Sequence, residues 1–250
     1  MIIDSHVHIG RRFDRRLTEY IQGGNFKMLG EQVIEDMDKA GIDMGITFGL
    51  LDLDTEYQAE IQKVHPDRLV SCAWIDPHKK GALDEFRRGV EVLGIRGLKL
   101  HGWWQQYSLA DHPLLDPFVE ICEKNHLPVI VHGMGDNCMT TPLQLENLAK
   151  AFPKVNFVLG HGGNLWLGDE GILVTKRNDN IFVDTAYMQS YWIKRFVEEV
   201  GAHKVCMGSD YPWYYLESTV QHIRDVLENP VDREWVMGRS IATVFDIPWK

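Results

Sequence analysis

Short apolar segments alternate with amphipathic segments along the whole chain. The apolar segments have the length and the content of branched or aromatic residues that are typical of buried strands, and turn residues follow most of them. Between these segments, apolar residues recur at helical spacing, as in Val33, Ile34, Met37 and Ala40. The pattern predicts eight strands, over residues 1–10, 44–51, 69–75, 95–101, 127–132, 156–161, 181–186 and 204–210.

Local signals predict where several of the intervening helices begin and end. Gly41 is typical of a residue that ends a helix in the left-handed conformation. Thr141 and Gln144 match a capping box, with Pro142 at the first helical position. Residues 164–176 are poorly patterned for a helix, and a last helical stretch is expected over residues 233–245.

The strict alternation of strands and helices predicts an α/β fold. We expect a single (β/α)8 TIM barrel with an extra C-terminal helix, with residues 1–250 forming one domain. A doubly wound open sheet is the alternative. That fold would not account for the reactive side chains that recur at the ends of the predicted strands.

The composition restricts the partners of the protein. The chain has 250 residues, of which 44% are hydrophobic, and this is enough to bury a large core. The net charge of -10 and the isoelectric point of about 5.5 argue against a nucleic acid or an anionic membrane, because both favour a basic surface. We therefore expect a small-molecule substrate.

The cysteines and the N-terminus predict a compartment. The four cysteines form no close pair and mostly lie in apolar runs, which is typical of reduced, structural thiols. The predicted fold begins at residue 2 and leaves no room for a signal peptide, and no apolar run approaches the length of a membrane span. These features predict a cytoplasmic protein.

Histidines gather at the ends of predicted strands. His6 and His8 lie one residue apart on the first strand, so their side chains share a face and suit one metal ion. Later strands end in further candidate groups, namely Lys99, His101, His132, His161 and Asp210. The carboxyl ends of parallel strands meet at one mouth of a barrel, so we expect these groups to converge there.

The order and spacing of these segments resemble the amidohydrolase superfamily. The resemblance is to its amidohydrolase-related branch, the aminocarboxymuconate-semialdehyde decarboxylase-like group. The matching segments are IDSHVH (3–8), HPDRL (65–69) with DP (76–77), GLKLH (97–101), VH (131–132), GHG (160–162) and GSDYP (208–212). The resemblance implies that His6, His8, His132 and Asp210 bind a divalent metal and that His161 faces the metal-bound water or the substrate.

The implied ligands suggest a metal and a reaction. Three imidazoles and a carboxylate suit zinc, so we expect one Zn²⁺, with Mn²⁺ as the alternative. A metal-activated water is a nucleophile near neutral pH, and Asp210 is the expected base that takes its proton and passes it to the leaving group. His161 is expected to polarise the substrate carbonyl or to stabilise the oxyanion.

Two roles are open for Lys99. In binuclear members of the superfamily, a lysine on the fourth strand is carboxylated and bridges two metals. Alternatively, Lys99 is an ordinary ammonium that contacts a substrate carboxylate or supports a metal ligand. We expect the second role, because a mononuclear site is the commoner pattern in this branch.

Aromatic residues are expected around the mouth of the barrel. Trp103, Trp104, Tyr187 and Trp213 fall in loops after the fourth, seventh and eighth strands. Together with His101 they predict an aromatic pocket for a small, partly planar substrate. The alternatives are that the aromatic residues pack between loops and that His101 is a surface histidine.

Three functions remain open from the sequence. The first is a metal-dependent hydrolase that acts on a small carboxylic ester, lactone or amide through a metal-activated water. The second is non-oxidative decarboxylation of an aromatic or enoic acid by the same residues. The short loops favour hydrolysis and are compatible with a homodimer. The third is a barrel that binds metal and ligand without turnover, which would have no use for a carboxylate beside an open metal site.

Overall fold

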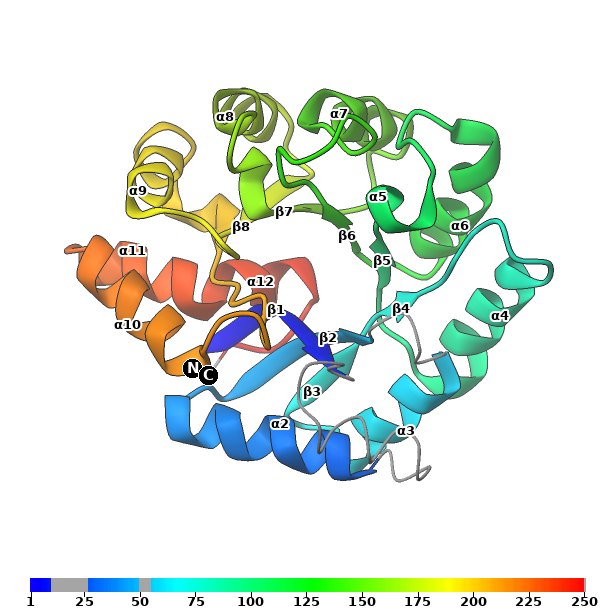
Figure 1. Cartoon of the computed structure of the whole chain (residues 1–250), viewed down its shortest axis with the longest axis horizontal. Coiled ribbons are helices and arrows are strands. Elements are labelled where there is room, and N and C mark those ends of the chain that lie inside the picture. Colours follow the sequence, from blue (N-terminus) through cyan, green and yellow to red (C-terminus); the bar gives the residue numbers. More distant parts are fainter. Residues whose placement is uncertain (10–26, 50–54, 250) are drawn as a thin grey trace.

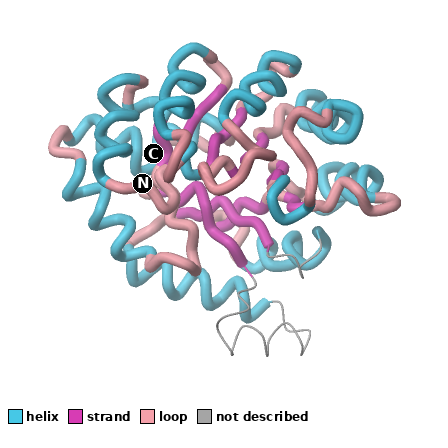
Figure 2. Tube along the Cα trace, turned by 45° about the horizontal axis from the view of Figure 1, so that its top comes forward, coloured by secondary structure: helices cyan, strands magenta, loops and turns pink. Residues whose placement is uncertain are grey.

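The computed structural model describes residues 1–9, 27–49 and 55–249. Residue 10 and residues 50–51, at the ends of the first two predicted strands, lie outside the described residues. The strands form a central group that the helices surround, as Figures 1 and 2 show. The strands are β1 (Ile3–Ile9), β2 (Met44–Gly49), β3 (Leu69–Ser71), β4 (Ala73–Trp74), β5 (Leu98–Leu100), β6 (Val129–His132), β7 (Phe157–Gly160), β8 (Ile181–Asp184) and β9 (Val205–Cys206).

All paired strands are parallel, and they follow one another in chain order. Strands β3 and β4 are two parts of the third predicted strand, and they are separated at Cys72. The Cys72 amide donates to the Thr47 carbonyl at 2.8 Å, and the next amide donates to the Gly97 carbonyl at 2.9 Å. The hydrogen bonding therefore passes from β2 to β5 through this one interrupted strand.

The first strand meets the segment that follows the last strand. Val7 pairs with Tyr211 in parallel, the His8 amide donates to the Tyr211 carbonyl at 2.8 Å, and the Asp210 amide donates to the His6 carbonyl at 3.0 Å. We call this contact between β1 and residues 207–211 the seam. The arrangement is a (β/α)8 barrel, and the prediction of that fold is confirmed.

Helices cover the outside of the barrel between successive strands (Figure 1). In chain order they are α2 (Lys27–Ala40), α3 (Thr55–Val64), α4 (Ala82–Arg88), η1 (Gly89–Leu93), α5 (Gly102–Gln105), α6 (His112–Lys124), α7 (Pro142–Ala151), η2 (His161–Gly163), α8 (Gly168–Arg177), α9 (Ser190–Glu199), η3 (Ala202–Lys204) and α10 (Leu216–Val226). Gly41 has a φ of 69° after α2, and Thr141 and Gln144 form the predicted capping box on α7. The poorly patterned segment after β7 becomes helical only at Gly168.

The predicted C-terminal helical stretch is present as α11 (Pro230–Glu234), η4 (Trp235–Arg239) and α12 (Ser240–Val244). Ile241 is fully buried and belongs to one apolar cluster with strand residues such as Ile3 and Val158. Phe245, directly after α12, belongs to the same cluster, and its carbonyl accepts from Arg96 at 2.8 Å. The end of the described chain thus packs against residues of the barrel strands. Within the described ranges, no helix is long and apolar enough to cross a membrane.

Candidate metal centre and catalytic pocket

A pocket of about 230 Å³ opens where strands β1, β6, β7 and β9 end. Its lining combines imidazoles, two carboxylates and large aromatic rings. The lining residues are His8, Trp74, His101, Trp103, Trp104, His132, Met134, Asp136, His161, Tyr187, Asp210 and Trp213. Of the six residues predicted from the sequence to contact a substrate, five line this pocket, and Lys99 does not.

His6 and His8 project from β1 toward the same place, as the spacing predicted. The Nδ1 atom of His6 lies 2.7 Å from the Asp184 carboxylate, and that of His8 lies 3.3 Å from the Gly49 carbonyl. Both of these partners accept hydrogen bonds, so each ring carries its proton on Nδ1. Burial lowers the pKa of both histidines well below its ordinary value and keeps the rings neutral. Each Nε2 atom thus presents a lone pair, and that of His6 accepts from the Lys99 Nζ atom at 3.2 Å.

The Asp210 carboxylate completes a cluster of three electron-rich atoms. Its Oδ1 atom lies 3.3 Å from His6 Nε2 and 3.6 Å from His8 Nε2. Taken together, the candidate ligand atoms of these three residues lie within 4.8 Å of one another. Two lone pairs and a carboxylate oxygen repel one another unless a proton or a cation lies between them, and burial raises the pKa of Asp210 to about 7. The donor set therefore fits a divalent metal ion.

Lys99 lies below this cluster and is fully buried. Its Nζ atom is 3.2 Å from His6 Nε2 and 4.3 Å from the centre of the Phe48 ring. Burial lowers the pKa of the ammonium to about 8, although Asp184 and Asp210 oppose that shift. The lysine contacts a candidate ligand histidine and is not among the residues that line the pocket. The supporting role of Lys99 stays a prediction, and its contact with His6 is the observation that favours it.

Asp184 links two of the site histidines. One carboxylate oxygen accepts from His6, and the other accepts from the backbone amides of His161 and Ala186 at 2.9 and 3.1 Å. His161 places its Nδ1 atom 3.1 Å from the Ala186 carbonyl, so its neutral ring presents Nε2 as a lone pair. A neutral His161 is therefore a proton acceptor toward the pocket, whereas the expected donor role requires a second proton on the ring.

The structure places His132 beside the cluster, but His132 is not one of the three clustered ligands. Its ring stacks on His101 with centroids 3.9 Å apart, and its Nε2 atom lies 3.3 Å from both oxygens of Asp136. Asp136 belongs to the loop after β6 and was not predicted from the sequence. The only available signal was its position in a polar loop four residues beyond a strand-end histidine.

The aromatic wall of the pocket includes one residue that the sequence analysis missed. Trp74 comes from β4 and is buried, and its ring is nearly parallel to those of His101 and Trp104. Trp103, Tyr187 and Trp213 are more exposed and stand at the rim. An inward tryptophan on a barrel strand has the same sequence pattern as a core residue, which is why periodicity did not reveal it.

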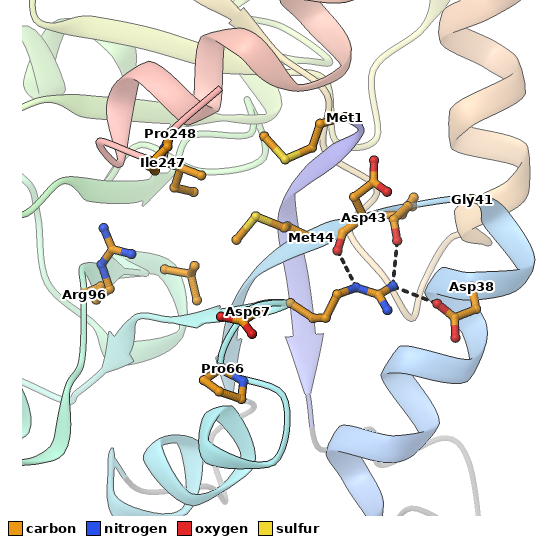
Figure 3. Close-up of a pocket in the computed structure, with 13 residues that line it drawn as sticks. Met1, Asp38, Gly41, Asp43, Met44, Pro66, Asp67, Arg96, Ile247 and Pro248 are labelled. Atoms are coloured by element: carbon orange, nitrogen blue, oxygen red, sulfur yellow. Dashed lines mark hydrogen bonds and ion pairs between the residues drawn. The ribbon is translucent and has the colours of Figure 1, made fainter. Parts of the chain in front are cut away.

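A larger hollow lies elsewhere, near Met1 and Pro248, and has a volume of about 990 Å³ (Figure 3). Arg68 lines this hollow and donates to the Ile42 carbonyl at 3.0 Å and to Asp38 at 2.7 Å. The Nη2 atom of Arg68 therefore already has acceptors within the protein. The hollow contains no cluster of metal-ligating groups among its lining residues, so its size does not indicate chemistry.

The chain matches the Amidohydrolase family model over residues 3–247. It therefore belongs to the amidohydrolase family, and the predicted resemblance is confirmed. It is an enzyme of a family that depends on divalent metals, and the cluster of His6, His8 and Asp210 is consistent with that property. No curated protein sequence matches the chain.

Solved structures with the same fold include enzymes of two reaction classes. An uncharacterised TIM-barrel protein from Bordetella bronchiseptica has a TM-score of 0.80 at 21% identity, with 98% of each chain covered. A 5-carboxyvanillate decarboxylase from Novosphingobium aromaticivorans, with bound manganese, has a TM-score of 0.73 at 17% identity, with 98% of this chain and 97% of that chain covered. A probable 2-pyrone-4,6-dicarboxylic acid hydrolase from Acinetobacter baumannii has 0.72 at 15% identity, with 98% of this chain and 99% of that chain covered.

Proposed function

We propose that this protein is a metal-dependent hydrolase of a small carboxylic ester, lactone or amide. The observation that carries the proposal is the convergence of two imidazole lone pairs on the Asp210 carboxylate at the mouth of a barrel. A carboxylate beside such a cluster is suited to take a proton from an attacking water. The cavity of about 230 Å³ limits the substrate to a small molecule.

We propose one Zn²⁺ as the metal, with Mn²⁺ as the alternative. Imidazole nitrogen and carboxylate oxygen suit zinc, whereas the Novosphingobium decarboxylase binds manganese. His6, His8 and Asp210 would hold the ion, and the family resemblance adds His132. When bound, the ion supplies Lewis-acid chemistry and lowers the pKa of water toward 7.

The chain's own residues then divide the remaining work. Asp210 takes a proton from water as the water oxygen bonds to the acyl carbon, and it returns that proton to the leaving alcohol or amine as the scissile bond breaks. His161 orients the water through its free Nε2 atom, since the Ala186 carbonyl holds its other nitrogen. The aromatic wall holds the substrate and excludes bulk water from the reacting centre.

Non-oxidative decarboxylation is a second candidate, and one observation favours it. The rings of Trp74, His101, Trp104 and His132 are nearly parallel, with interplanar angles of 9–18° for the stacked pairs. Such a wall suits a flat, conjugated acid at least as well as an ester. The similar structures include both a decarboxylase and a probable hydrolase, so structural similarity does not separate the two candidates.

Oxygen-18 labelling of metal-loaded protein distinguishes the candidates. Lactones, esters, amides and aryl acids are supplied in H₂¹⁸O, and the products are analysed by mass spectrometry. Hydrolysis is expected to place one ¹⁸O atom in the acid product and to release no carbon dioxide, and His8→Ala is expected to abolish it. His112→Ala, which removes a partly exposed histidine that pairs with Asp116 outside the pocket, is the matched control. Carbon dioxide release without ¹⁸O in the remaining product would replace hydrolysis by decarboxylation.

A further inference from the structure

One buried carboxylate outside the metal cluster joins the two segments that carry the candidate ligands. Asp4 is fully buried on β1, and its Oδ1 atom accepts from the His6 amide at 2.9 Å and from the Ser209 amide at 3.0 Å. The first amide belongs to a candidate ligand, and the second belongs to the residue before another, Asp210. A single oxygen atom therefore holds both sides of the seam next to the cluster.

Ser209 extends this connection across Asp210. Its Oγ atom donates to the His6 carbonyl at 3.3 Å and accepts from the Tyr211 amide at 2.9 Å. The Asp210 amide donates to the same His6 carbonyl at 3.0 Å. The successive amides of residues 209–211 are thus bound by Asp4 or His6, either directly or through one hydroxyl group.

These hydrogen bonds surround an unfavourable backbone conformation. Asp210 has a φ of 61°, in the left-handed region that residues with a side chain rarely adopt. Such a residue keeps its conformation only where the surrounding structure enforces it. The hydrogen bonds on both sides of Asp210 supply that constraint, and they thereby fix its carboxylate, whose Oδ1 atom lies 3.3 Å from His6 Nε2.

The two sides of the seam also lie in close contact. The pairing of β1 with β2 shifts its register between Asp4 and Val7, as at the bulges that direct a side chain toward a site. On the other side, a β-carbon on Gly208 would lie only 2.9 Å from the His6 Cβ atom. The backbone at Gly208 thus lies directly against His6, so a shift of residues 208–210 would change the spacing of the ligands.

We propose that Asp4 and Ser209 are positioning residues for the metal cluster, and that they set the distance between the His6 and Asp210 side chains by holding residues 209–211 against β1. The proposal rests on the proposed function, because it assumes that His6 and Asp210 hold the metal ion. Asp4 and Ser209 belong neither to the cluster of three ligands nor to the lining of the catalytic pocket. Their effect on the metal therefore passes through Asp210.

Zinc affinity tests this inference without any substrate. Competition with a chromophoric chelator is expected to show a loss of about tenfold or more in Ser209→Ala and in Asp4→Ala, because residues 209–211 are no longer held against β1. Asp4→Asn keeps an acceptor oxygen and is expected to retain most of the affinity. The loss caused by Ser209→Ala should disappear when Asp210→Ala is already present, because positioning matters only while that carboxylate is there.

Ser240→Ala is the matched control for Ser209→Ala. Ser240 is also buried, and its Oγ atom donates to the Ala202 carbonyl at 2.9 Å, before β9 begins, whereas the cluster lies beyond the end of β9. Urea unfolding is expected to show that both variants lose stability, but only Ser209→Ala should lose zinc affinity. With Co²⁺ in place of zinc, the visible absorption reports the ligands of the ion. The Ser209→Ala spectrum is expected to shift toward that of Asp210→Ala, and the Ser240→Ala spectrum is expected to match the wild type.

Each outcome bears on the proposal. Zinc affinity and a Co²⁺ spectrum that stay at wild-type values in Ser209→Ala would overturn it, even if Asp4→Ala fails to fold, and so would an equal loss of affinity in Ser240→Ala. Equal losses in Asp4→Asn and Asp4→Ala would contradict the role of the acceptor oxygen. Zinc binding that is lost in His8→Ala but unchanged in Ser209→Ala would reject only this inference. A wild-type protein that binds no zinc would reject the proposed function as well.

Discussion

At the scale of single residues, the hydrogen bond at one ring nitrogen of a histidine determines what the other ring nitrogen can bind. His6, His8 and His161 each place Nδ1 against a carboxylate or carbonyl oxygen. These oxygens can only accept, so all three neutral rings present Nε2 as a lone pair. The hydrogen bonds behind the site thus prepare it for a cation before any cation arrives.

Removing the charge behind His6 should weaken the metal site. Asp184→Asn keeps one oxygen for the His161 and Ala186 amides but places an N–H₂ group or an uncharged oxygen against His6 Nδ1. Zinc affinity is expected to fall about 10- to 100-fold, as measured by competition with a chromophoric chelator. Asp116→Asn, which changes a similar histidine pair on α6 at 2.8 Å, should leave the affinity unchanged. Equal affinities for the two variants would show that Asp184 does not tune the ligand.

Three site residues adopt an unusual backbone conformation. His161, Tyr187 and Asp210 follow β7, β8 and β9, and their φ angles are 63°, 62° and 61°. Side chains other than glycine rarely occupy this left-handed region, and such residues concentrate at functional sites. His161 directly follows β7, whereas Tyr187 and Asp210 lie three and four residues beyond β8 and β9, and all three line the pocket.

Residue patterns revealed the ligands better than they revealed the pocket wall. His6, His8 and Asp210 were predicted because reactive side chains at strand ends are unusual, and the structure brings them together. Trp74 and Asp136 were missed. In the sequence, a buried tryptophan looks like an ordinary core residue, and an aspartate in a polar loop looks like an ordinary surface residue. The pairing of His132 with Asp136 could not be predicted from the sequence either, since it depends on the path of the loop after β6.

At the scale of elements, one carboxylate joins two neighbouring helices. Glu146 is on α7 and is nearly buried, and it pairs with Arg177 at the end of α8 and with Asn178 just beyond it. The hydrogen bonds from Arg177 are the main reason that the pKa of this carboxyl falls from 4.5 to about 2. The contact therefore depends on an ionised glutamate.

This contact predicts a stability difference that depends on pH. Because the pKa of Glu146 is lowered in the folded chain, its contribution is complete above about pH 4.5 and is lost as the pH falls toward 2. Glu146→Gln should melt below the wild type at pH 7, and the gap between the two Tm values should shrink between pH 4.5 and 3. Glu120→Gln, at an exposed position on α6, should show no such convergence. A gap that widened on acidification would reject this account.

Element boundaries followed from the sequence where local chemistry fixes them. The capping box on α7 and Gly41 after α2 were predicted and are present. The late start of α8 was only suggested by poor patterning, because residues 161–167 are held by contacts with β6 and β8 loops, such as Asn164 with the Tyr187 carbonyl. The break at Cys72 could not be predicted, since it reflects a change of hydrogen-bonding partner between neighbouring strands.

At the scale of the whole molecule, the last helical stretch is part of the barrel's core. Ile241→Ala should destabilise the fold by about 2–5 kcal/mol, because it removes a fully buried side chain from the cluster that joins α12 to the strands. Urea unfolding measures this change. Val231→Ala on α11, 58% exposed, should cost far less, and zinc affinity of the folded protein should be the same in both variants. A large loss of zinc affinity in Ile241→Ala would show that α12 also shapes the metal site.

The seam places the two halves of the metal cluster at opposite ends of the chain. His6 and His8 leave the ribosome first, but Asp210 reaches them only after some two hundred further residues have been made and β9 has docked beside β1. A nascent or prematurely ended chain therefore has two of the three clustered ligands and no closed site. Metal retention would thus report that a molecule has been synthesised through its eighth β-α unit, which makes it a direct quality test for newly made protein.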